Sequence, residues 1–330
     1  MPKYILTGVG GHLGSIAATY AIEIAPADST LVFTVSDLTK LPPSKLEAWR
    51  SSGVQVTQAS YDDVSSLERV FAGADAVNLI STWAFGRRHE QARNVIQAAR
   101  TCGVRRICYT SFVGADDPAP VEQMPFLPRD HKQTEALIMG SGLEWNIQRD
   151  WLYVDNIPTY FAPSWGWCGE RWEGKDGVAS GAASWLCNSH GARGAYVARE
   201  DCGRVLAALL LGRGQPNTVY DVTGPQAVTD QEVFDWVCGA FGVKGELVDV
   251  PDHELRKWWI ARGLPTSVTE PSPLPMKLCV DDLLCCGEMV ARGYLTKTSD
   301  AVELLTGRKP LSFQEVLLTY KDTFVSQPHE

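Results

Sequence analysis

The 330-residue sequence predicts an α/β fold, in which a doubly wound parallel sheet precedes a smaller, mainly helical region. Three observations predict this fold. Short apolar runs alternate with amphipathic stretches from residue 3 to residue 149, as in parallel strands flanked by helices. A glycine-rich turn joins the first apolar run to the first amphipathic stretch. After Arg149 the alternation ends, and Trp- and Gly-rich segments begin.

Six strands and five helices are expected in the first region. The expected strands are Tyr4–Leu6, Leu31–Val35, Val54–Val56, Ala76–Ile80, Arg106–Tyr109 and Glu144–Gln148. The expected helices are Leu13–Ile24, Ser44–Ser52, Val64–Ala72, Arg87–Cys102 and Asp130–Gly140. Sheets of this kind bind ligands beyond the carboxyl ends of their strands, so functional residues are expected in the loops that follow the strands.

The second region is expected to have a separate task, which in folds of this kind is to supply a substrate pocket. Its expected elements are helices at Glu200–Leu211, Thr229–Phe241, His253–Ala261 and Ser312–Phe324 and a strand at Thr218–Val222. We place the boundary between domains 1–152 and 153–330, with the alternative that part of 192–225 returns to the first sheet. The Pro-rich segment Leu264–Pro275 indicates an exposed loop.

Composition excludes several classes of protein. A net charge of −9 and a pI near 5.2 argue against a nucleic-acid surface. No segment approaches the roughly 20 apolar residues of a membrane helix, and the first strand begins at Lys3, so neither a membrane span nor a signal peptide is expected. Nine cysteines without a C-x-x-C pair indicate reduced thiols rather than a zinc site. We therefore expect a cytoplasmic protein without bound metal.

Three glycines with G-x-x-G-x-x-G spacing, Gly8, Gly11 and Gly14, follow the first strand. The first permits a tight turn, the second lets backbone N–H groups approach a pyrophosphate, and the third lets helix and strand pack closely. The helix N-terminus favours an anion. These features predict a dinucleotide cradle, although a strand-to-helix turn also needs glycine for steric reasons alone. The expected cofactor contacts here are Thr7, Gly8, Gly10, Gly11, His12, Leu13 and Gly14.

Further motifs follow along the chain. They are Leu79–Thr82, Tyr109–Ser111, His131 with Glu135, Arg199 with Asp201, and Leu304–Pro310. In their order and spacing the chain resembles the NmrA-like group of atypical short-chain dehydrogenases, and within it the NAD(P)H:quinone oxidoreductase type. The resemblance covers nearly the whole chain and implies a Rossmann fold with an NADP-type cofactor. NmrA-like proteins also serve specialised-metabolite pathways, particularly in fungi, and we expect this chain to be such a member.

The segment after the second strand bears on the choice of dinucleotide. The resembled family usually has an arginine there that pairs with the 2′-phosphate, whereas this chain has Ser36, Asp37 and, further on, Lys40. Asp37 would repel a phosphate and accept hydrogen bonds from a free ribose, unless it only caps the turn. The resemblance implies NADPH, with NADH as the alternative. Further expected cofactor contacts are Ser60, Tyr61, Ser81, Thr82, Trp83, Thr110 and Arg149.

The catalytic residues have to be unusual, because the sequence contains no Tyr-x-x-x-Lys. His131 lies eighteen residues before Arg149, where the related isoflavone-reductase-like enzymes carry a catalytic lysine. An imidazole suits proton transfer near neutral pH. We expect Asp130 to cap a helix whose first turn holds His131, with a hydrogen bond to Glu135 as the structural alternative. Ser111 is expected to polarise the acceptor, unless it only caps the strand.

Tryptophan is concentrated in one segment. Six of the eleven tryptophans lie between Trp145 and Trp185, a density that predicts a pocket for a large, flat, apolar substrate or an aromatic cage for an amine cation. A Trp-rich core is the alternative. The expected substrate contacts are Trp83, Phe112, Asp150, Trp151, Tyr160, Phe161, Trp165 and Trp167.

Together these observations predict an NAD(P)H-dependent oxidoreductase that reduces a C=O, C=C or C=N group of a bulky aromatic or alkaloid-like substrate. Cyclisation of the product, templated by the same pocket, is an additional hypothesis. The alternatives are a non-catalytic NAD(P)-sensing regulator and a general quinone reductase. The expected partner is a small aromatic molecule, not a nucleic acid or a membrane, and the protein is expected to be a monomer or a homodimer.

Overall fold

The computed structural model describes residues 1–84, 86–158, 183–242, 245–261, 263–267, 270 and 279–325. Its centre is a seven-stranded sheet with the order β3-β2-β1-β4-β5-β6-β9, and every pair in it is parallel. The strands are β1 (Lys3–Leu6), β2 (Thr30–Val35), β3 (Gln55–Gln58), β4 (Ala76–Ile80), β5 (Arg106–Phe112), β6 (Glu144–Asp150) and β9 (Thr218–Val222). The order reverses between β1 and β4, where such sheets bind their ligands. The expected fold class is therefore confirmed.

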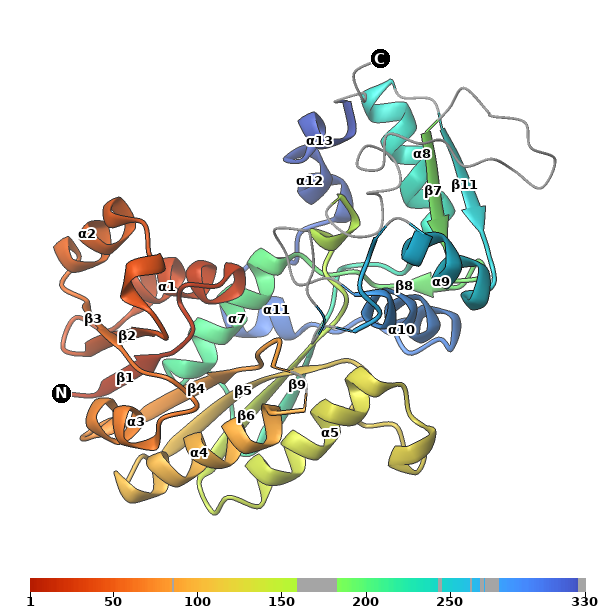
Figure 1. The fold of residues 1–330 in the computed structure, drawn as a ribbon. Coiled ribbons are helices and arrows are strands. Elements are labelled where there is room, and N and C mark those ends of the chain that lie inside the picture. Colours follow the sequence, from red (N-terminus) through yellow and green to blue (C-terminus); the bar gives the residue numbers. More distant parts are fainter. Residues whose placement is uncertain are drawn as a thin grey trace.

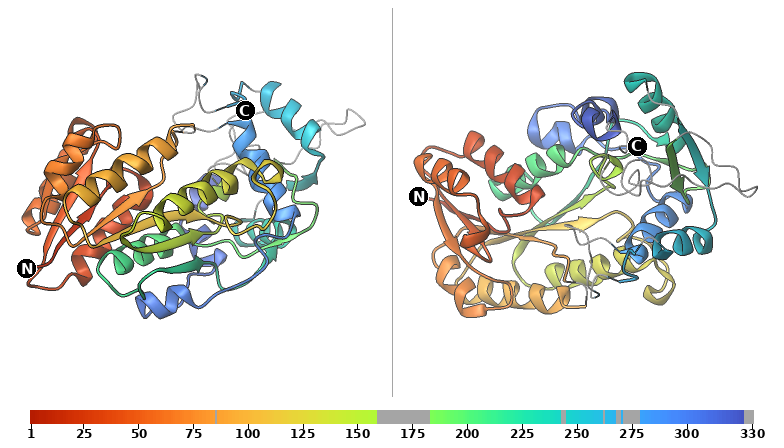
Figure 2. Two further views of the ribbon diagram at one scale, coloured as in Figure 1. Left: turned by 90° about the horizontal axis from the view of Figure 1, so that it is seen from below. Right: turned by 45° about the horizontal axis from the view of Figure 1, so that its top comes forward.

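Helices cover both faces of this sheet (Figures 1 and 2). One face carries α1 (His12–Ile24), α2 (Pro43–Ser51), α7 (Arg199–Leu210) and α11 (Ala301–Thr306). The other face carries α3 (Val64–Phe71), α4 (Arg88–Thr101) and α5 (Phe126–Met139). Strand side chains are consequently buried on both sides: Phe33 packs toward α1 and α2, whereas Val77 and Ile147 pack toward α3 and α4. This double covering explains why the central strands β1, β2 and β4 are largely apolar.

Three differences from the expected boundaries affect residues of the expected site. The strands β5 and β6 continue to Phe112 and Asp150, so Thr110 and Ser111 lie inside a strand instead of beyond it. The helix α5 begins at Phe126, not at Asp130, because Pro125 precedes it with φ −54° and Pro128 falls in its first turn, where no backbone donor is needed. His131 therefore lies beyond the first turn, and the helix dipole acts on it less than expected.

The remaining elements form a smaller mixed region beyond the carboxyl ends of the strands (Figure 1). Its elements are β7 (Ala183–Cys187), β8 (Arg193–Gly194), β10 (Val228–Thr229), α8 (Asp230–Phe241), β11 (Gly245–Asp249), α9 (Asp252–Ala261), α10 (Val280–Ala291), α12 (Phe313–Leu318) and α13 (Lys321–Val325). Capping boxes begin α8 and α12. The helix expected at Ser312–Phe324 is interrupted at Thr319 and Tyr320, and α10 and α11 had not been expected.

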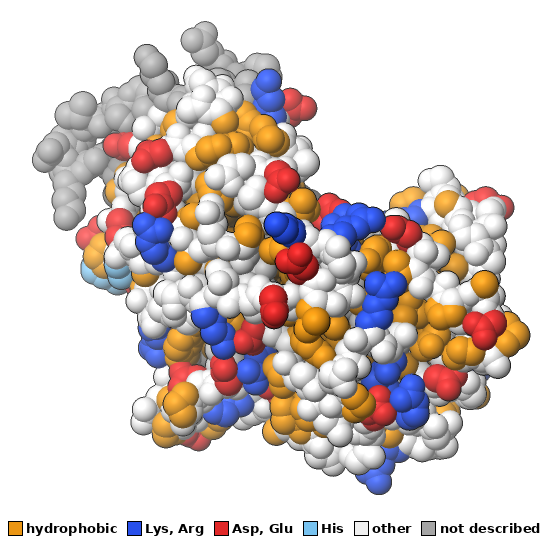
Figure 3. Space-filling model, turned by 180° about the vertical axis from the view of Figure 1, so that it is seen from behind, with side chains coloured by type: hydrophobic (Ala, Val, Ile, Leu, Met, Phe, Trp, Pro, Cys, Tyr) orange, Lys and Arg blue, Asp and Glu red, His pale blue; other side chains and the backbone are white. Residues whose placement is uncertain are grey.

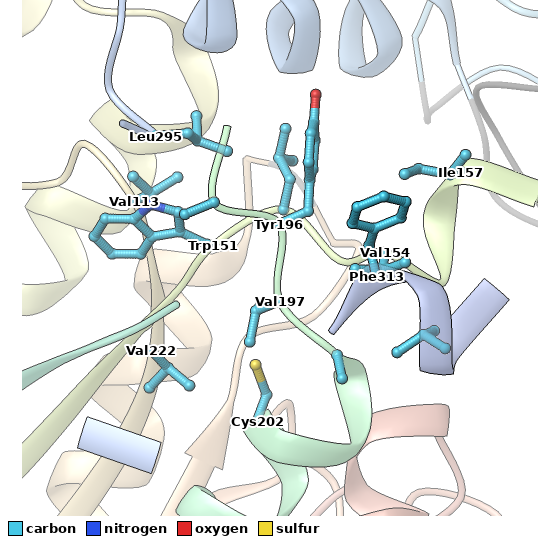
Figure 4. Packing of buried hydrophobic residues seen from close by; sticks show 14 of the residues in the cluster. Val113, Trp151, Val154, Ile157, Tyr196, Val197, Cys202, Val222, Leu295 and Phe313 are labelled. Atoms are coloured by element: carbon cyan, nitrogen blue, oxygen red, sulfur yellow. The ribbon is translucent and has the colours of Figure 1, made fainter. Parts of the chain in front are cut away.

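An apolar cluster joins the two regions. Trp151, Val113 and Val222 from the sheet side pack with Tyr196 and Leu295 from the smaller region, as Figure 4 shows. On the face shown in Figure 3, Lys and Arg side chains are interspersed with Asp and Glu. No helix in the described ranges is long and apolar enough to cross a membrane. The shared cluster fixes the smaller region over the ends of the strands.

Candidate functional site

A cleft with a volume of about 530 Å³ opens at the carboxyl ends of the strands. It is lined by the glycine loop, by the ends of β4, β5 and β6, and by side chains from α4, α5, α7 and α10. Most of the expected site residues lie together along this cleft. They are Gly8, Gly11, His12, Leu13, Gly14, Tyr61, Ser81, Thr82, Trp83, Thr110, Ser111, Phe112, His131, Asp150 and Trp151.

The glycine loop has the geometry of a phosphate cradle. Gly8 adopts φ +69°, and a Cβ on Gly14 would lie 2.2 Å from the carbonyl oxygen of Gly8. The loop is therefore so tight that position 14 has no room for a side chain. Partial burial lowers the pKa of His12, and the nearby Arg199 and Lys45 lower it further, whereas Asp155 raises it. These residues fit the pyrophosphate of a dinucleotide.

Two of the expected contacts lie behind the cradle. Thr7 donates its backbone N–H to Oδ1 of Asn78 over 2.6 Å, and its hydroxyl hydrogen bonds to the phenol of Tyr61. Ser60 accepts a hydrogen bond from the backbone of Asp62 over 3.2 Å. Neither Thr7 nor Ser60 lines the cleft, and Thr7 holds the phenol of Tyr61 in position.

The residues expected at the adenosine end also lie outside the lining of the cleft. Asp37 accepts a hydrogen bond from the backbone N–H of Thr39 over 2.9 Å and thereby caps the short 3-10 helix Leu38–Lys40. This hydrogen bonding lowers the pKa of Asp37, so the exposed carboxylate is charged. The Lys40 ammonium lies 3.9 Å from it. Gly10 packs beside Val35, which keeps this turn next to the glycine loop.

His131 is held on the opposite wall by two neighbours. Its Nδ1 lies 2.9 Å from the phenol oxygen of Tyr109, and its Nε2 lies 3.5 Å from Nη1 of Arg88. Arg88 is fixed in turn by an ion pair with Asp130 at 2.9 Å. Burial, with smaller contributions from Arg88 and His89, lowers the pKa of His131 well below 6.5. The imidazole is therefore neutral near pH 7.

Ser111 belongs to a second buried polar group. Its hydroxyl donates to Oε1 of Glu135 over 2.6 Å, and Arg149 donates to the two oxygens of Glu135 over 2.8 and 2.7 Å. Arg149 also lies 3.2 Å from Asp116 and does not line the cleft. The hydrogen of Ser111 is thus committed to Glu135, and Ser111 presents only acceptor lone pairs to a ligand. Glu135 is engaged by these residues and not by His131.

The substrate side of the cleft is partly aromatic. Trp83 is 41% exposed, Trp151 is buried, and Phe112 packs 5.7 Å from the His131 ring. Asp150 accepts hydrogen bonds from Nε2 of Gln148 and from the phenol of Tyr153, both over 2.8 Å. Burial raises the pKa of Asp150 to about 6. The other expected contacts, Tyr160, Phe161, Trp165 and Trp167, lie outside the described residues.

Several lining residues were not expected as site residues. They are Ile80, Ala84, Arg88, Leu127, Leu152, Tyr153, Asn156, Arg199, Asp282 and Cys286. Its place in the sequence pointed weakly to Arg88 as a site residue, because Arg88 directly follows the loop after a buried strand. No such signal pointed to Asp282, because α10 lies far along the sequence from every other part of the cleft.

Comparisons with known proteins identify NAD(P)H-binding relatives of this chain. Residues 11–160 match a family model described as NAD(P)H-binding. Quinone oxidoreductase 2 of Escherichia coli is 30% identical over 224 residues, which cover 68% of this chain and 69% of that protein. An NmrA-like family domain-containing oxidoreductase of Aspergillus flavus is 24% identical over 259 residues, covering 77% of this chain and 76% of that protein.

Solved structures show the same fold. An NADPH-dependent quinone oxidoreductase of Escherichia coli, complexed with NADPH, superposes with a TM-score of 0.78 at 23% identity, over 97% of this chain and 99% of that chain. A triphenylmethane reductase of a Citrobacter species gives a TM-score of 0.74 at 21% identity, over 97% of this chain and 100% of that chain. The chain belongs to the NAD(P)H-binding, NmrA-like family of atypical short-chain dehydrogenases and is an NAD(P)H-dependent oxidoreductase.

Proposed function

We propose that this protein uses NADPH to reduce a C=O, C=C or C=N group in a flat, conjugated aromatic substrate. One observation carries the proposal: a single cleft connects the glycine cradle with the aromatic side chains Trp83, Phe112 and Trp151. Quinones belong to this substrate class, and they are the acceptors named for the Escherichia coli relative.

The residues of the cleft fit this reaction. Bound NADPH supplies a hydride. The glycine loop and the strand-end groups Ser81 and Thr110 hold the dinucleotide along the ends of the strands, while Phe112 and Trp151 offer apolar surface to a planar ring. Because the aromatic wall and the cradle belong to one cleft, the two reactants are held side by side.

His131 fits the role of a positioning residue better than that of a charged proton donor. Its imidazole is neutral, and both ring nitrogens face protein groups. Arg88 can only donate, so its contact with Nε2 favours the tautomer with the proton on Nδ1, which then donates to Tyr109. Through these contacts His131 keeps Arg88 and the wall beside Phe112 in place for the substrate.

The preference for NADPH is supported by basic side chains beside the adenosine end. Lys45 lies against Ser15 in the first turn of α1, and Lys40 stands on the turn after β2. The two ammonium groups would pair with a 2′-phosphate, whereas Asp37 opposes it. We propose that the two lysines outweigh the single carboxylate.

The test is a nucleotide titration followed by assays of NADPH oxidation with three acceptor classes: quinones, aldehydes and cyclic imines. Each class is represented by an aromatic acceptor and by a small non-aromatic analogue. We expect tighter binding of NADPH than of NADH, and a higher kcat/KM for the aromatic member of at least one class. Binding of NADPH without turnover of any acceptor would overturn the proposal and favour a sensor. Equal turnover of small and bulky quinones would favour a general quinone reductase.

A further inference from the structure

Asp282 brings a carboxyl group into the cleft from the smaller region. It lies in the first turn of α10, is 7% exposed, and lines the cleft together with Cys286, one turn further along the same helix face. Its carboxyl makes no hydrogen bond or ion pair within the described part of the chain. Asp150 differs, because Gln148 and Tyr153 already donate to its two oxygens.

The surroundings of Asp282 disfavour a charged carboxylate. The charged group that acts on it is the Arg88 guanidinium of α4. On its own helix it faces the thiols of Cys279, Cys285 and Cys286, whose pKa values are raised by burial and by Asp282. Arg88 forms its ion pair with Asp130 instead. Burial raises the pKa of Asp282 to about 6, and this effect outweighs the attraction of Arg88 and of the helix N-terminus. A buried carboxylic acid whose hydrogen has no acceptor is costly, and a ligand acceptor would relieve that cost.

From this placement we propose that Asp282 is a catalytic residue that hydrogen bonds to the heteroatom of the reducible group and donates its proton there. The inference rests on the proposed function. The substrate carbon gains a hydride, the π bond to the heteroatom breaks, and the oxygen or nitrogen takes the proton from Asp282. Asp282 is left as a carboxylate and regains a proton from water. Asp282 thus supplies the acid that the missing Tyr-x-x-x-Lys pair would otherwise provide.

Asp282 could instead act as a carboxylate that binds a cationic substrate. The two roles predict opposite dependences on pH. An acid acts only while protonated, so kcat falls as pH rises through the pKa of Asp282. An anchor acts only while ionised, so affinity for a cation rises over the same range. The observations favour the acid, because no described donor stabilises the ionised carboxyl.

The experiment compares Asp282→Asn with Asp281→Asn in the full-length protein. Asp281 is the matched control: it lies in the same helical turn, but it is 42% exposed and pairs with Arg256 over 2.7 Å. With an acceptor that the wild type reduces, we expect Asp282→Asn to lower kcat about 100-fold and to remove the fall of kcat with pH. NADPH affinity is expected to stay unchanged in both variants, and Asp281→Asn is expected to keep the wild-type kcat.

A second measurement does not depend on turnover. Infrared difference spectra between acidic and neutral pH detect the C=O stretch of protonated carboxyls in the NADPH-bound protein. We expect Asp282→Asn to lose one such signal and Asp281→Asn to keep it. An unchanged spectrum in Asp282→Asn, an unchanged kcat, or a rise in KM alone for cationic substrates would each overturn the proton-donor role. These outcomes differ from a failure of the proposed function, because in that case the wild-type protein reduces no acceptor.

Discussion

The phenol oxygen of Tyr109 lies 2.9 Å from Nδ1 of His131, although 22 residues separate them in the sequence. Tyr109 packs in the core beneath the sheet and is 2% exposed. Its hydroxyl, however, lies at the boundary between that core and the cleft. This contact makes a core residue part of the support of the candidate site.

Removing the hydroxyl in Tyr109→Phe leaves the buried Nδ1 of His131 without its partner. We expect the free energy of unfolding to fall by about 1–2 kcal/mol and kcat to fall while NADPH affinity is retained. Chemical denaturation and steady-state kinetics measure both effects. Tyr4→Phe is the matched control, because Tyr4 is also buried and its hydroxyl makes no hydrogen bond within the described residues. Equal effects in the two variants would contradict the role of Tyr109.

Replacing His131 with Ala is expected to lower turnover much more than cofactor affinity. The imidazole holds the position of Arg88 and packs against Phe112, but it makes no contact with the glycine loop. Steady-state kinetics and NADPH titration on the same preparation separate the two quantities. An unchanged kcat would remove His131 from the site.

Gly14→Ala is expected to abolish measurable NADPH binding. The new Cβ would lie 2.2 Å from the carbonyl oxygen of Gly8, and a backbone atom in a tight turn cannot move aside cheaply. Gly239→Ala is the control, since Gly239 lies in α8 with open space around its Cβ position. That change is expected to stabilise the fold by about 0.5–1 kcal/mol. Normal NADPH binding by Gly14→Ala in a fluorescence titration would show that the loop is not the cradle.

Asp37→Asn is expected to shift the ratio of dissociation constants a few-fold toward NADPH. The change removes a negative charge near the site of a 2′-phosphate while keeping an oxygen that can accept from Thr39. Lys40→Ala is the opposing variant and is expected to favour NADH. Parallel titrations with both dinucleotides give the ratio. If neither variant changes this ratio, the 2′-phosphate binds away from Asp37 and Lys40.

Glu135→Gln is expected to destabilise the protein by about 3 kcal/mol. Arg149 and Glu135 are largely buried, so a neutral partner leaves the guanidinium with Asp116 as its remaining ion-pair partner among the described residues. Arg105→Gln is the control, because Arg105 is 57% exposed in its pair with Glu144 and its loss is expected to cost less than about 1 kcal/mol. Similar midpoints of urea unfolding in the two variants would contradict this difference.

Much of the first region was predictable from local sequence. The spacing of Gly8, Gly11 and Gly14 predicted a cradle whose tightness the structure shows at Gly14. Each of the six expected strands overlaps a strand of the observed sheet. The start of α5 was misjudged, because Asp130 is a common capping residue while Pro125 and Pro128 resemble a turn. The role of Glu135 was likewise hidden, since its partner Arg149 comes from the next strand.

The sequence by itself determined the parallel sheet, the glycine loop and the family, because periodicity, turn chemistry and motif spacing are local properties of the chain. Only the tertiary structure decided which side chains meet in the cleft. Packing of α10 over the ends of the strands brings Asp282 into the cleft near Arg88. Burial then lowers the pKa of His131 and raises the pKa values of Asp150 and Asp282. A pKa depends on what surrounds a group in space, and packing between distant segments sets those surroundings.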